Sequence, residues 1–495
     1  MSFMPKLSIR KLVSFVIMPL AILYILLFAD IAPENPKIAY TLCVGLIMAV
    51  LWITEVVPLA VTSLIPVALF PLFGIMDGRA VAATYFNDVI FLFMGGFLVS
   101  LAMEKWDLHK RIAFNILYFT GTSPARILLG FMLASFFLSM WISNTATAMM
   151  MLPIAMAIIR QLTGLMKNKS STKFAIGILL GVAYSASTGG MATLVGTPPN
   201  LSFMRIFHIY FPDLPEISFY KWMLFALPVS LIMLASIWAF LYMVFRPKKG
   251  EWIDVDKHTF LNQLKEMGRT TYEQKVVFVI FAILAVLWIT RADIDFGVLK
   301  VPGWSNLFPN AAFINDGTVA IFIALILFFI PSKSVKGDQI MEWATAVKLP
   351  WSILLLFGGG FALATGFKDS GLSLWFGGHL SGIANLHPIL IIFIICLLIT
   401  SLTELTSNTA TTEMVLPILA GIAITTGMNP LMLMIPATLS ASMAFMLPVA
   451  TPPNAIIFGT GLISVRQMAM TGIAINILGA VVSTLMMYFW GSFVF

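Results

Sequence analysis

Long apolar segments, separated by short polar joints, constrain this chain more than any other feature of its sequence. Many of them approach the length of about 20 residues that a helix needs to cross a hydrocarbon core. Lipid offers no hydrogen-bonding partner, so a segment that crosses it has to satisfy its own backbone, as a helix does. The sequence therefore predicts an all-α polytopic membrane protein.

The composition supports the same class. Of the 495 residues, 60% are hydrophobic and 10% are charged, whereas soluble domains are about 45–50% apolar and 25% charged. The net charge of +7 is spread over the joints, so we interpret it as a topology signal and expect no nucleic-acid partner. Cys43 and Cys396 both lie within apolar segments, which predicts packing roles and no disulfide framework.

The apolar segments predict eleven transmembrane helices. The first, near 12–32, contains Pro19 and lacks a small-residue cleavage site after it, so we expect a retained helix and not a signal peptide. The others are expected near 38–54, 56–75, 88–104, 174–210, 221–245, 275–292, 316–331, 350–367, 430–460 and 471–490.

Four landmarks occur twice in the chain, in the same order. The pentapeptide Ser-Asn-Thr-Ala-Thr stands at 143–147 and again at 407–411, an offset of 264 (407 − 143), and Gly-Gly-Phe at 95–97 returns at 359–361 with the same offset. The sequence Ala-Val-Leu-Trp-Ile-Thr at 49–54 returns at 285–290, and Thr-Pro-Pro-Asn at 197–200 returns at 451–454. This order indicates an internal duplication.

The duplication divides the chain into four parts. We expect an N-terminal first helix over 1–37, a first repeat over 38–245, a charged cytoplasmic linker over 246–274 and a second repeat over 275–495. Each repeat has five predicted spans. Because five is an odd number, the two repeats must be inverted relative to each other.

The segment around each pentapeptide is predicted to be a re-entrant hairpin. Arg126 and Arg160 are separated by 34 steps (160 − 126), about 51 Å as one helix, which is too long for a core of about 30 Å and too short for two crossings. Two arms that meet at the pentapeptide fit better, and polar non-helical backbone at that depth must be buried in protein or line a wet cavity. We expect hairpins over 124–160 and 388–425.

Adjacent prolines interrupt a second kind of segment. Pro198 and Pro199 remove backbone donors within the apolar stretch 174–210, so this span is predicted to be unwound in its middle.

Lys and Arg residues predict the orientation. They gather at 6–11, 105–111, 160–173, 246–275 and 333–348, which places the N-terminus in the cytoplasm and the C-terminus outside the cell membrane. The first hairpin, with Arg126 and Arg160 at its mouth, should open to the cytoplasm. The matching positions of the second hairpin are Leu390 and Ile424, as expected for a mouth that faces outward.

Inverted repeats with helices broken at corresponding places are typical of secondary transporters that bind their substrate near the midplane. Ser, Thr and Asn oxygens, together with carbonyls freed at the proline turns, can form a cage for a hard cation such as sodium. The helices that begin at Thr145 and Thr409 direct free N–H groups and a positive dipole end at the tips, which favours an anion. Two converging tips suit a dianion, and an anion affinity that depends on bound cations is the basis of symport.

Helix capping alone is the competing interpretation of each Ser-Asn-Thr motif. The duplication, with each copy paired to its own Thr-Pro-Pro-Asn, favours a binding site. Thr403, which matches Ser139 under the offset of 264, is a good candidate for a cation ligand.

Two acidic residues lie close to the second tip. Glu404 and Glu413 stand where the first repeat has Met140 and Met149. Intramembrane acids are costly, and these two are candidates for proton carriers, cation ligands or paired groups on the flank of the hairpin.

Duplicated Ser-Asn-Thr tips, paired with Thr-Pro-Pro turns in an eleven-span inverted repeat, resemble the divalent anion/sodium symporter family of di- and tricarboxylate transporters. The resemblance covers the chain from about residue 38 to its end. It implies two or more sodium ions, one between each tip and its proline turn, and a substrate whose carboxylates meet both tips and both turns. The implied ligands of the first sodium are Ser139, Ser143, Asn144 and Gly196; those of the second are Thr403, Thr406, Asn408 and Ala450; the implied substrate-binding residues are Asn144, Thr145, Thr197, Asn408, Thr409, Thr451 and Pro452.

The resemblance also implies a homodimer whose transport domain moves across the membrane against a fixed scaffold. Ala450 stands where the first repeat has Gly196, and since each would supply only a carbonyl, this departure puts little in doubt.

The resulting hypothesis is sodium-coupled uptake of a C4-dicarboxylate such as succinate, malate or fumarate. An exchanger without sodium coupling, and citrate or sulfate as substrate, stay open, as does a channel. An enzyme is not expected, because the chain has no Gly-x-Ser-x-Gly with a plausible His, no His-Glu-x-x-His and no paired intramembrane Asp.

Overall fold

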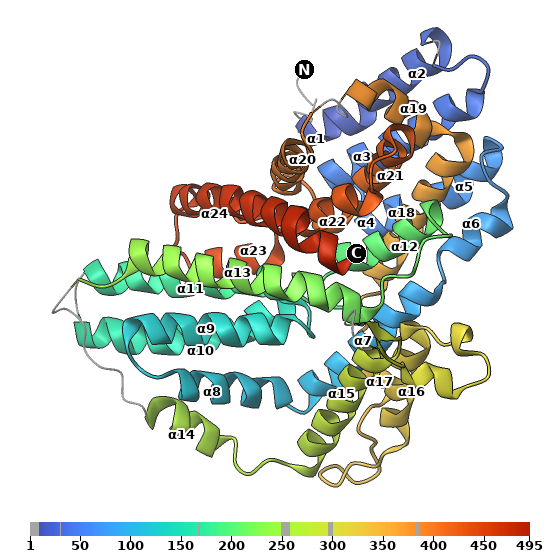
Figure 1. The fold of residues 1–495 in the computed structure, drawn as a ribbon. Helices are drawn as coiled ribbons and strands as arrows, with labels where there is room; N and C mark the ends of the chain where they lie inside the picture. The colour runs from blue at the N-terminus through green and yellow to red at the C-terminus, as the bar shows by residue number, and fades with distance from the viewer. Residues whose placement is uncertain (1–8, 30, 167–168, 249–257, 296–299, 383–385) are drawn as a thin grey trace, which may run out of the picture.

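The structure, a computed structural model, describes residues 9–29, 31–166, 169–248, 258–295, 300–382 and 386–495. Its helices form one bundle in which elements of the two halves of the chain are interleaved (Figure 1). In the described part of the chain, ten helices are long and apolar enough to cross a membrane. The all-α polytopic prediction is thereby confirmed, and the count of eleven spans stays a prediction.

The helices of the first half run from the N-terminal segment to the long helix α13. Their bounds are α1 Ile9–Leu12, η1 Val13–Ile17, α2 Met18–Phe28, α3 Pro36–Thr54, α4 Leu59–Thr62, α5 Ile65–Leu72, α6 Gly78–Thr84, α7 Asp88–Lys105, α8 Leu108–Thr120, α9 Pro124–Ser139, α10 Asn144–Met166, α11 Lys169–Met191, α12 Pro198–Tyr210 and α13 Phe219–Phe245.

The second half follows a similar order of elements. Its bounds are α14 His258–Glu266, α15 Tyr272–Thr290, β1 Ile294–Asp295, β2 Lys300–Val301, η2 Trp304–Leu307, η3 Ala311–Phe313, α16 Asp316–Phe329, α17 Trp343–Ala346, α18 Trp351–Ser370, α19 Leu372–Leu380, α20 Pro388–Thr403, α21 Asn408–Thr426, α22 Pro430–Ala441, α23 Pro452–Phe458, α24 Val465–Met486, η5 Met487–Gly491 and α25 Ser492–Val494. The strands β1 and β2 pair antiparallel, with Ile294 opposite Val301.

One predicted span is wrong as a single helix, and a second contains the break expected at its proline turn. The segment 56–75 forms two short helices, α4 and α5, because prolines at its start and inside α5 remove backbone donors. The segment 430–460 forms α22 and α23 with non-helical backbone between them, as the Pro452-Pro453 pair at the start of α23 requires. The predicted break in 174–210 is confirmed by the end of α11 at Met191 and the start of α12 at Pro198.

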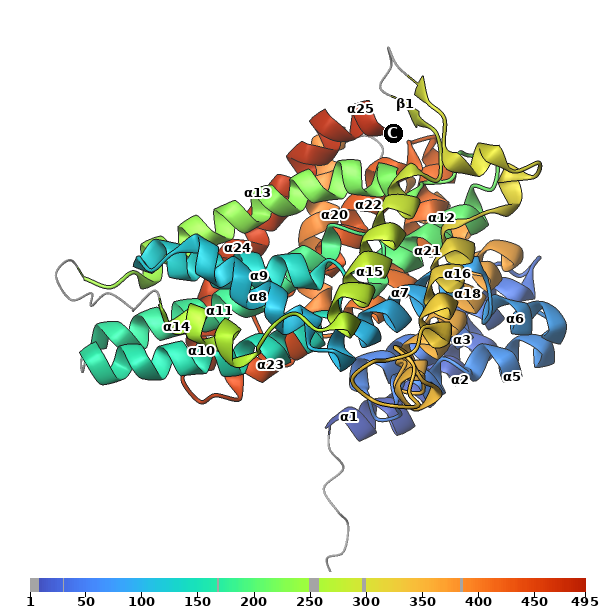
Figure 2. The same cartoon turned by 90° about the horizontal axis from the view of Figure 1, so that it is seen from below.

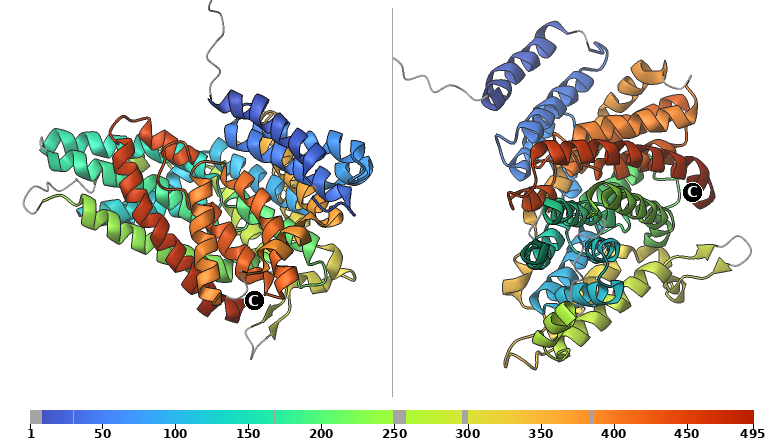
Figure 3. Two further views of the ribbon diagram at one scale, coloured as in Figure 1. Left: turned by 90° about the horizontal axis from the view of Figure 1, so that it is seen from above. Right: turned by 90° about the vertical axis from the view of Figure 1, so that its left-hand side faces the viewer.

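Other predicted boundaries differ at their ends. The first helix runs from Ile9 to Phe28 in place of 12–32, and it lies at the edge of the bundle beside α3 (Figure 3). The linker 246–274 contains α14, although residues 249–257 lie outside the described residues. The segments predicted as hairpins are helix pairs, α9 with α10 and α20 with α21, and α10 continues to Met166, past the predicted limit of 160.

Corresponding elements of the two halves make corresponding contacts. Helix α9 packs against α11 as α20 packs against α22, and α11 against α13 as α22 against α24; Figure 2 shows α9, α11 and α13 side by side. The halves also exchange partners, since α10 packs on α23 and α12 packs on α21. The two tips and the two proline turns are thereby brought to one place.

The repeated glycines mark close helix crossings. A Cβ added to Gly95 of α7 would lie 2.5 Å from the carbonyl carbon of Ala320 in α16. Gly359 of α18, its counterpart, likewise lies against the backbone of Ser63 between α4 and α5. Small residues at such crossings let membrane helices approach closely, so the repeated Gly-Gly-Phe motif has a packing role.

Phe93 and Phe357 are counterparts under the same offset of 264 (357 − 93), and they touch each other. Their ring centroids lie 5.3 Å apart with the ring planes at 88°, an edge-to-face contact. Phe93 also lines the cavity described below.

Candidate functional site

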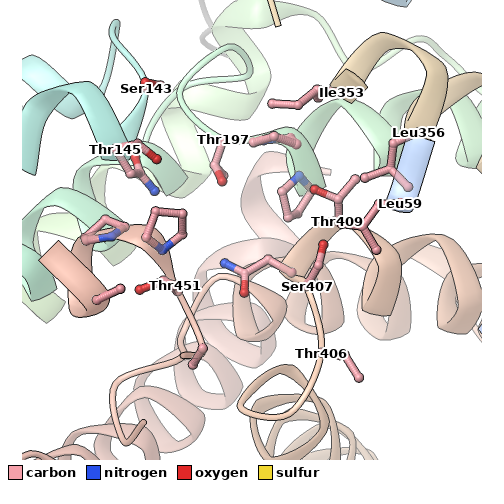
Figure 4. A pocket seen from close by; sticks show the side chains of 18 of the residues that line it. Leu59, Ser143, Thr145, Thr197, Ile353, Leu356, Thr406, Ser407, Thr409 and Thr451 are labelled. Atoms are coloured by element: carbon pink, nitrogen blue, oxygen red, sulfur yellow. The ribbon is translucent and has the colours of Figure 1, made fainter. Parts of the chain in front are cut away.

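One cavity of about 630 Å³ lies where four polar segments of the chain meet. These are the first tip (residues 143–145), the first proline turn (196–200), the second tip (407–409) and the second proline turn (450–454). Figure 4 shows Thr145, Thr197, Thr409 and Thr451 around this space, each carried by a different segment. Side chains more than 300 residues apart in sequence therefore share one site.

The first tip is held by short-range hydrogen bonds. Helix α9 ends at Ser139 and α10 begins at Asn144. The hydroxyl of Ser139 donates to Oδ1 of Asn144, and the N–H of Ala146 donates to Oγ of Ser143 at 3.2 Å. Ser143 caps α10 while Ser139 fixes the side-chain oxygen of Asn144, so capping and site formation occur together.

The second tip repeats this geometry. Thr403 donates from Oγ1 to Oδ1 of Asn408 at 2.8 Å, and the N–H of Ala410 donates to Oγ of Ser407 at 3.3 Å. The hydroxyl of Thr406 is hydrogen-bonded to that of Thr411. Each tip therefore presents a hydroxyl and an amide oxygen within reach of one cation.

An asparagine at the end of each proline turn holds the unwound backbone before it. Nδ2 of Asn200 donates to the carbonyls of Thr193 at 2.7 Å and Gly190 at 3.2 Å. Nδ2 of Asn454 donates to the equivalent carbonyls, those of Leu447 at 3.1 Å and Ala444 at 2.9 Å. The Asn of Thr-Pro-Pro-Asn is thus a structural residue, fully buried in both copies.

Four helices begin at the cavity: α10, α12, α21 and α23. The N-terminus of a helix carries free N–H groups and a partial positive charge, which stabilise an anion nearby. Two of the four start with Pro-Pro, which lacks backbone donors, so α10 and α21 supply most of the free N–H groups. The floor of the cavity is neutral in formal charge but favourable to an anion.

All predicted substrate-binding residues line this cavity. They are Asn144, Thr145, Thr197, Asn408, Thr409, Thr451 and Pro452. Of the predicted sodium ligands, Ser143, Asn144, Gly196, Thr406, Asn408 and Ala450 line it too. Ser139 and Thr403 lie behind it, in contact with Asn144 and Asn408. The structure brings every predicted site residue together, and their roles stay predictions.

Gly196 and Ala450 are less equivalent than expected. A Cβ added to Gly196 would lie 2.5 Å from the carbonyl oxygen of Gly190, whereas the second turn accommodates the methyl group of Ala450. A Cβ added to Gly190 would in turn lie 2.6 Å from Oδ1 of Asn144. The first turn is therefore packed more tightly against its tip than the sequence predicted.

Glu404 is a hydrogen-bonded group on the flank of the α20–α21 helix pair, and pairing of this kind is one of the roles left open for it. Its carboxylate accepts hydrogen bonds from the backbone N–H groups of Phe445, Met446 and Leu447 at 2.8, 2.9 and 3.0 Å, and from Nδ2 of Asn476 at 2.8 Å. Glu404 thereby fixes the non-helical segment that leads into the second proline turn.

Glu413 lies in the interior, fully buried, and does not line the cavity. Its Oε1 accepts a hydrogen bond from Ser202 of α12 at 2.5 Å, and its Oε2 has no hydrogen-bond partner among the described residues. The carboxyl group also lies against Gly360, where an added Cβ would overlap it. Glu413 therefore connects α21, α12 and α18 directly behind the site.

Sequence reasoning missed the apolar wall and the two charged residues of the cavity. The wall includes Phe93, Phe97, Leu59, Ile353 and Leu356, and the charged residues are Arg10 and Glu55. Of these seven residues, only Phe97 belongs to one of the four repeated landmarks. In the described part of the chain, no group of three or more His, Cys, Asp or Glu side chains is arranged to hold a metal.

A family model described as the sodium:sulfate symporter transmembrane region matches residues 8–495. The chain belongs to this family. Membership makes it a multi-pass membrane transporter and not an enzyme.

Two relatives in the sodium:sulfate symporter family are similar over nearly their whole length. A protein of Staphylococcus saprophyticus named sodium-dependent dicarboxylate transporter SdcS is 41% identical over 489 residues, with 97% of this chain and 92% of the relative covered. The protein of the same name from Staphylococcus aureus is 42% identical over 488 residues, with 97% and 91% covered.

Two solved structures share the fold. The Alcanivorax borkumensis YdaH transporter has a TM-score of 0.57 at 12% identity, covering 86% of this chain and 89% of that one. The Neisseria gonorrhoeae MtrF structure has a TM-score of 0.57 at 11% identity, covering 83% of each chain.

Proposed function

We propose that this protein is a sodium-coupled symporter of C4-dicarboxylates such as succinate, malate and fumarate. The observation that carries the proposal is the meeting of two identical tips and two proline turns around one cavity that holds neutral donors, free helix N-termini and two hydroxyl–amide oxygen pairs. The names of the two SdcS relatives support both the cation and the substrate class.

The charge balance of the site explains why sodium is needed. A dianion placed among neutral side chains loses its hydration and gains no full positive charge from the tips. One sodium ion about 4 Å from a carboxylate contributes roughly 4 kcal/mol at an effective dielectric constant of about 20, nearly three powers of ten in affinity. One sodium ion at each oxygen pair would make a neutral cluster with a dianion. The affinity for dicarboxylate would therefore rise with the sodium concentration, and the affinity for sodium would rise with the dicarboxylate concentration.

The domain arrangement belongs to the same proposal. The first helix occupies 1–37, the inverted repeats occupy 38–245 and 275–495, and a cytoplasmic linker of 246–274 joins them. The matched helix contacts and the Phe93–Phe357 contact support a two-fold relation between the repeats. The helix pairs α9–α10 and α20–α21 act as re-entrant hairpins, the N-terminus is cytoplasmic and the C-terminus is extracytoplasmic.

The cavity opens to the cytoplasm in this orientation. Arg10, Ile53, Glu55 and Leu59 line it, and all four lie at the ends of elements that the Lys and Arg distribution places on the cytoplasmic side. We therefore infer an inward-open state. Transport proceeds as in the family that the sequence resembles, by movement of the tips and turns against a fixed scaffold within a homodimer.

Uptake into proteoliposomes tests the proposal. Labelled succinate should enter rapidly when sodium is higher outside than inside and slowly when choline replaces sodium, and unlabelled malate and fumarate should compete. Asn144→Ala is the matched inactive control. Uptake that does not depend on sodium but is strongly stimulated by internal dicarboxylate would establish an exchanger instead. Competition by citrate or sulfate, without competition by malate or fumarate, would change the substrate class.

A further inference from the structure

The cavity carries two charged side chains in the described part of the chain, Arg10 and Glu55. Both are exposed, and among the ion pairs of the described residues none joins them. The tips and turns that form the floor are uncharged. Among the described residues that line the cavity, these two therefore supply the full charges that an entering ion meets.

A buried hydrogen bond fixes both residues at the rim. Oγ of Ser14 and Oγ1 of Thr54 lie 2.8 Å apart, and Ser14 is the one buried residue in the helical segment 9–28. Arg10 precedes Ser14 by four residues, so it lies one turn away on the same helix face. Glu55 directly follows Thr54. The peripheral first helix thus brings a guanidinium group to the cavity that holds the tips.

The backbone of Glu55 adopts a conformation that is unusual for a residue with a side chain. It ends α3 in the left-handed region, with φ 50° and ψ 28°, where glycine is usual and another residue costs about 1 kcal/mol or more. The corresponding position of the second repeat, after Thr290, is Arg291, which is 6% exposed and pairs with Asp316 and Glu216. The second repeat neutralises its charge at this position, whereas Glu55 lines the cavity.

We propose that Arg10 is a capture and positioning residue for the dicarboxylate on the side of the membrane that holds the N-terminus, and that Glu55 does the same for sodium. The identity of the anion rests on the proposed function. A charge of the right sign at the mouth of a cavity with low-dielectric walls raises the local concentration of its ligand. Arg10 attracts a dianion before the neutral tips receive it, and Glu55 keeps the net charge of the rim near zero so that the cation is not repelled.

Charge variants measured from one side of the membrane test the proposal. Inside-out and right-side-out vesicles present opposite faces, and initial rates give the KM for succinate and the half-saturating sodium concentration from each. From the N-terminal side, Arg10→Gln should raise the KM for succinate about tenfold at low ionic strength, Arg10→Glu should raise it further, and Arg10→Lys should keep it near the wild-type value. Glu55→Gln should lower the KM for succinate and raise the sodium requirement.

The controls separate capture from folding. Arg246→Gln removes an exposed basic residue that does not line the cavity and should leave both constants unchanged. Choline chloride at about 0.5 M should abolish most of the Arg10 effect by screening, and the thermal unfolding midpoint in detergent should not change. An unchanged KM in Arg10→Gln and Arg10→Glu, or an equal change from both faces, would overturn the proposal.

The outcome can be separated from that of the proposed function. If sulfate or citrate turns out to be the substrate, the dicarboxylate assignment fails, but the Arg10 series makes the same prediction for that anion, because only its negative charge enters the argument. If wild-type transport does not need sodium, coupling fails and the Glu55 prediction with it, while the succinate KM still reports on Arg10.

Discussion

Thr403 donates a hydrogen bond from Oγ1 to Oδ1 of Asn408 at 2.8 Å, and Ser139 makes the same bond to Asn144. Each pair holds an amide side chain at the floor of the cavity with one donor and one acceptor in a fixed orientation. The two pairs are equivalent under the offset of 264, so the chain carries the same tip geometry twice.

Replacing Asn144 or Asn408 with alanine should abolish transport. Each change removes an amide that, in the proposed function, contacts both the anion and a cation, and we expect that the remaining tip cannot replace it. Labelled succinate uptake should fall to background while the protein still inserts and elutes as the same oligomer. Asn115→Ala, which removes an amide from the distant helix α8, is the matched control and should transport normally. Normal uptake in both tip variants would remove the site assignment.

Thr403→Val should weaken sodium dependence more than substrate binding. The substitution keeps the shape of the side chain and removes the oxygen beside Asn408. We expect the binding free energy of sodium to fall by about 1.4 kcal/mol. This loss corresponds to about a tenfold rise in the sodium concentration for half-maximal transport. Thr400→Val is the matched control, since Thr400 lies one turn earlier on α20 and donates to the carbonyl of Ser440 at 3.3 Å. If the transport rate depends on the sodium concentration in the same way for both variants, a ligand role for Thr403 would be contradicted.

Glu404→Gln should destabilise the protein. The four donors around Glu404 all need an acceptor, and a glutamine places an NH2 group against at least one of them, at a cost of roughly 1–3 kcal/mol. The thermal unfolding midpoint should fall and uptake should fall with it, because the second proline turn loses its support. Unchanged stability together with altered sodium stoichiometry would instead make Glu404 a cation ligand.

Glu413→Gln should have a milder effect than Glu404→Gln. The amide oxygen of glutamine can still accept the hydrogen bond from Ser202, so the connection between α21 and α12 is kept. Uptake and the unfolding midpoint should stay close to wild type, whereas Ser202→Ala should lower both slightly. Complete loss of uptake by Glu413→Gln in a correctly assembled protein would show that the carboxyl group takes part in transport.

Gly196→Ala should impair transport although alanine occupies the equivalent position 450. The added methyl group would lie 2.5 Å from the carbonyl oxygen of Gly190, and backbone overlap of this kind costs about 1–3 kcal/mol. Uptake should fall about tenfold or more. Gly378→Ala is the matched control, since an added Cβ there has no neighbour within 4 Å. Normal transport by Gly196→Ala would mean that the first turn is free to rearrange.

The sequence predicted most of the helices because apolar length alone determines whether a segment can cross a membrane. It failed at 56–75, where scattered prolines break the helix without changing the hydrophobicity of the segment. The tips and turns were found because the chain carries them twice. Their exact packing was not, since whether Gly196 tolerates a methyl group depends on the distance to Gly190 across a turn.

Residues without a repeated pattern could not be assigned to the site from sequence. Arg10 and Glu55 lie close to the Ser14–Thr54 hydrogen bond, which joins two helices, and the apolar sequence around Ser14 and Thr54 does not predict that contact. The proline pair at 452–453 predicts a break between α22 and α23, but the sequence does not show that the carboxylate of Glu404 accepts hydrogen bonds from the backbone of 445–447 there.

Net flux against a substrate gradient tests the central claim most directly. Proteoliposomes loaded with labelled succinate at the same concentration inside and outside should accumulate succinate when sodium is higher outside, and should lose it when the sodium gradient is reversed, with labelled sodium moving in the same direction in a fixed ratio. Succinate that equilibrates in both cases and moves only by one-for-one exchange with internal dicarboxylate would contradict sodium-coupled symport.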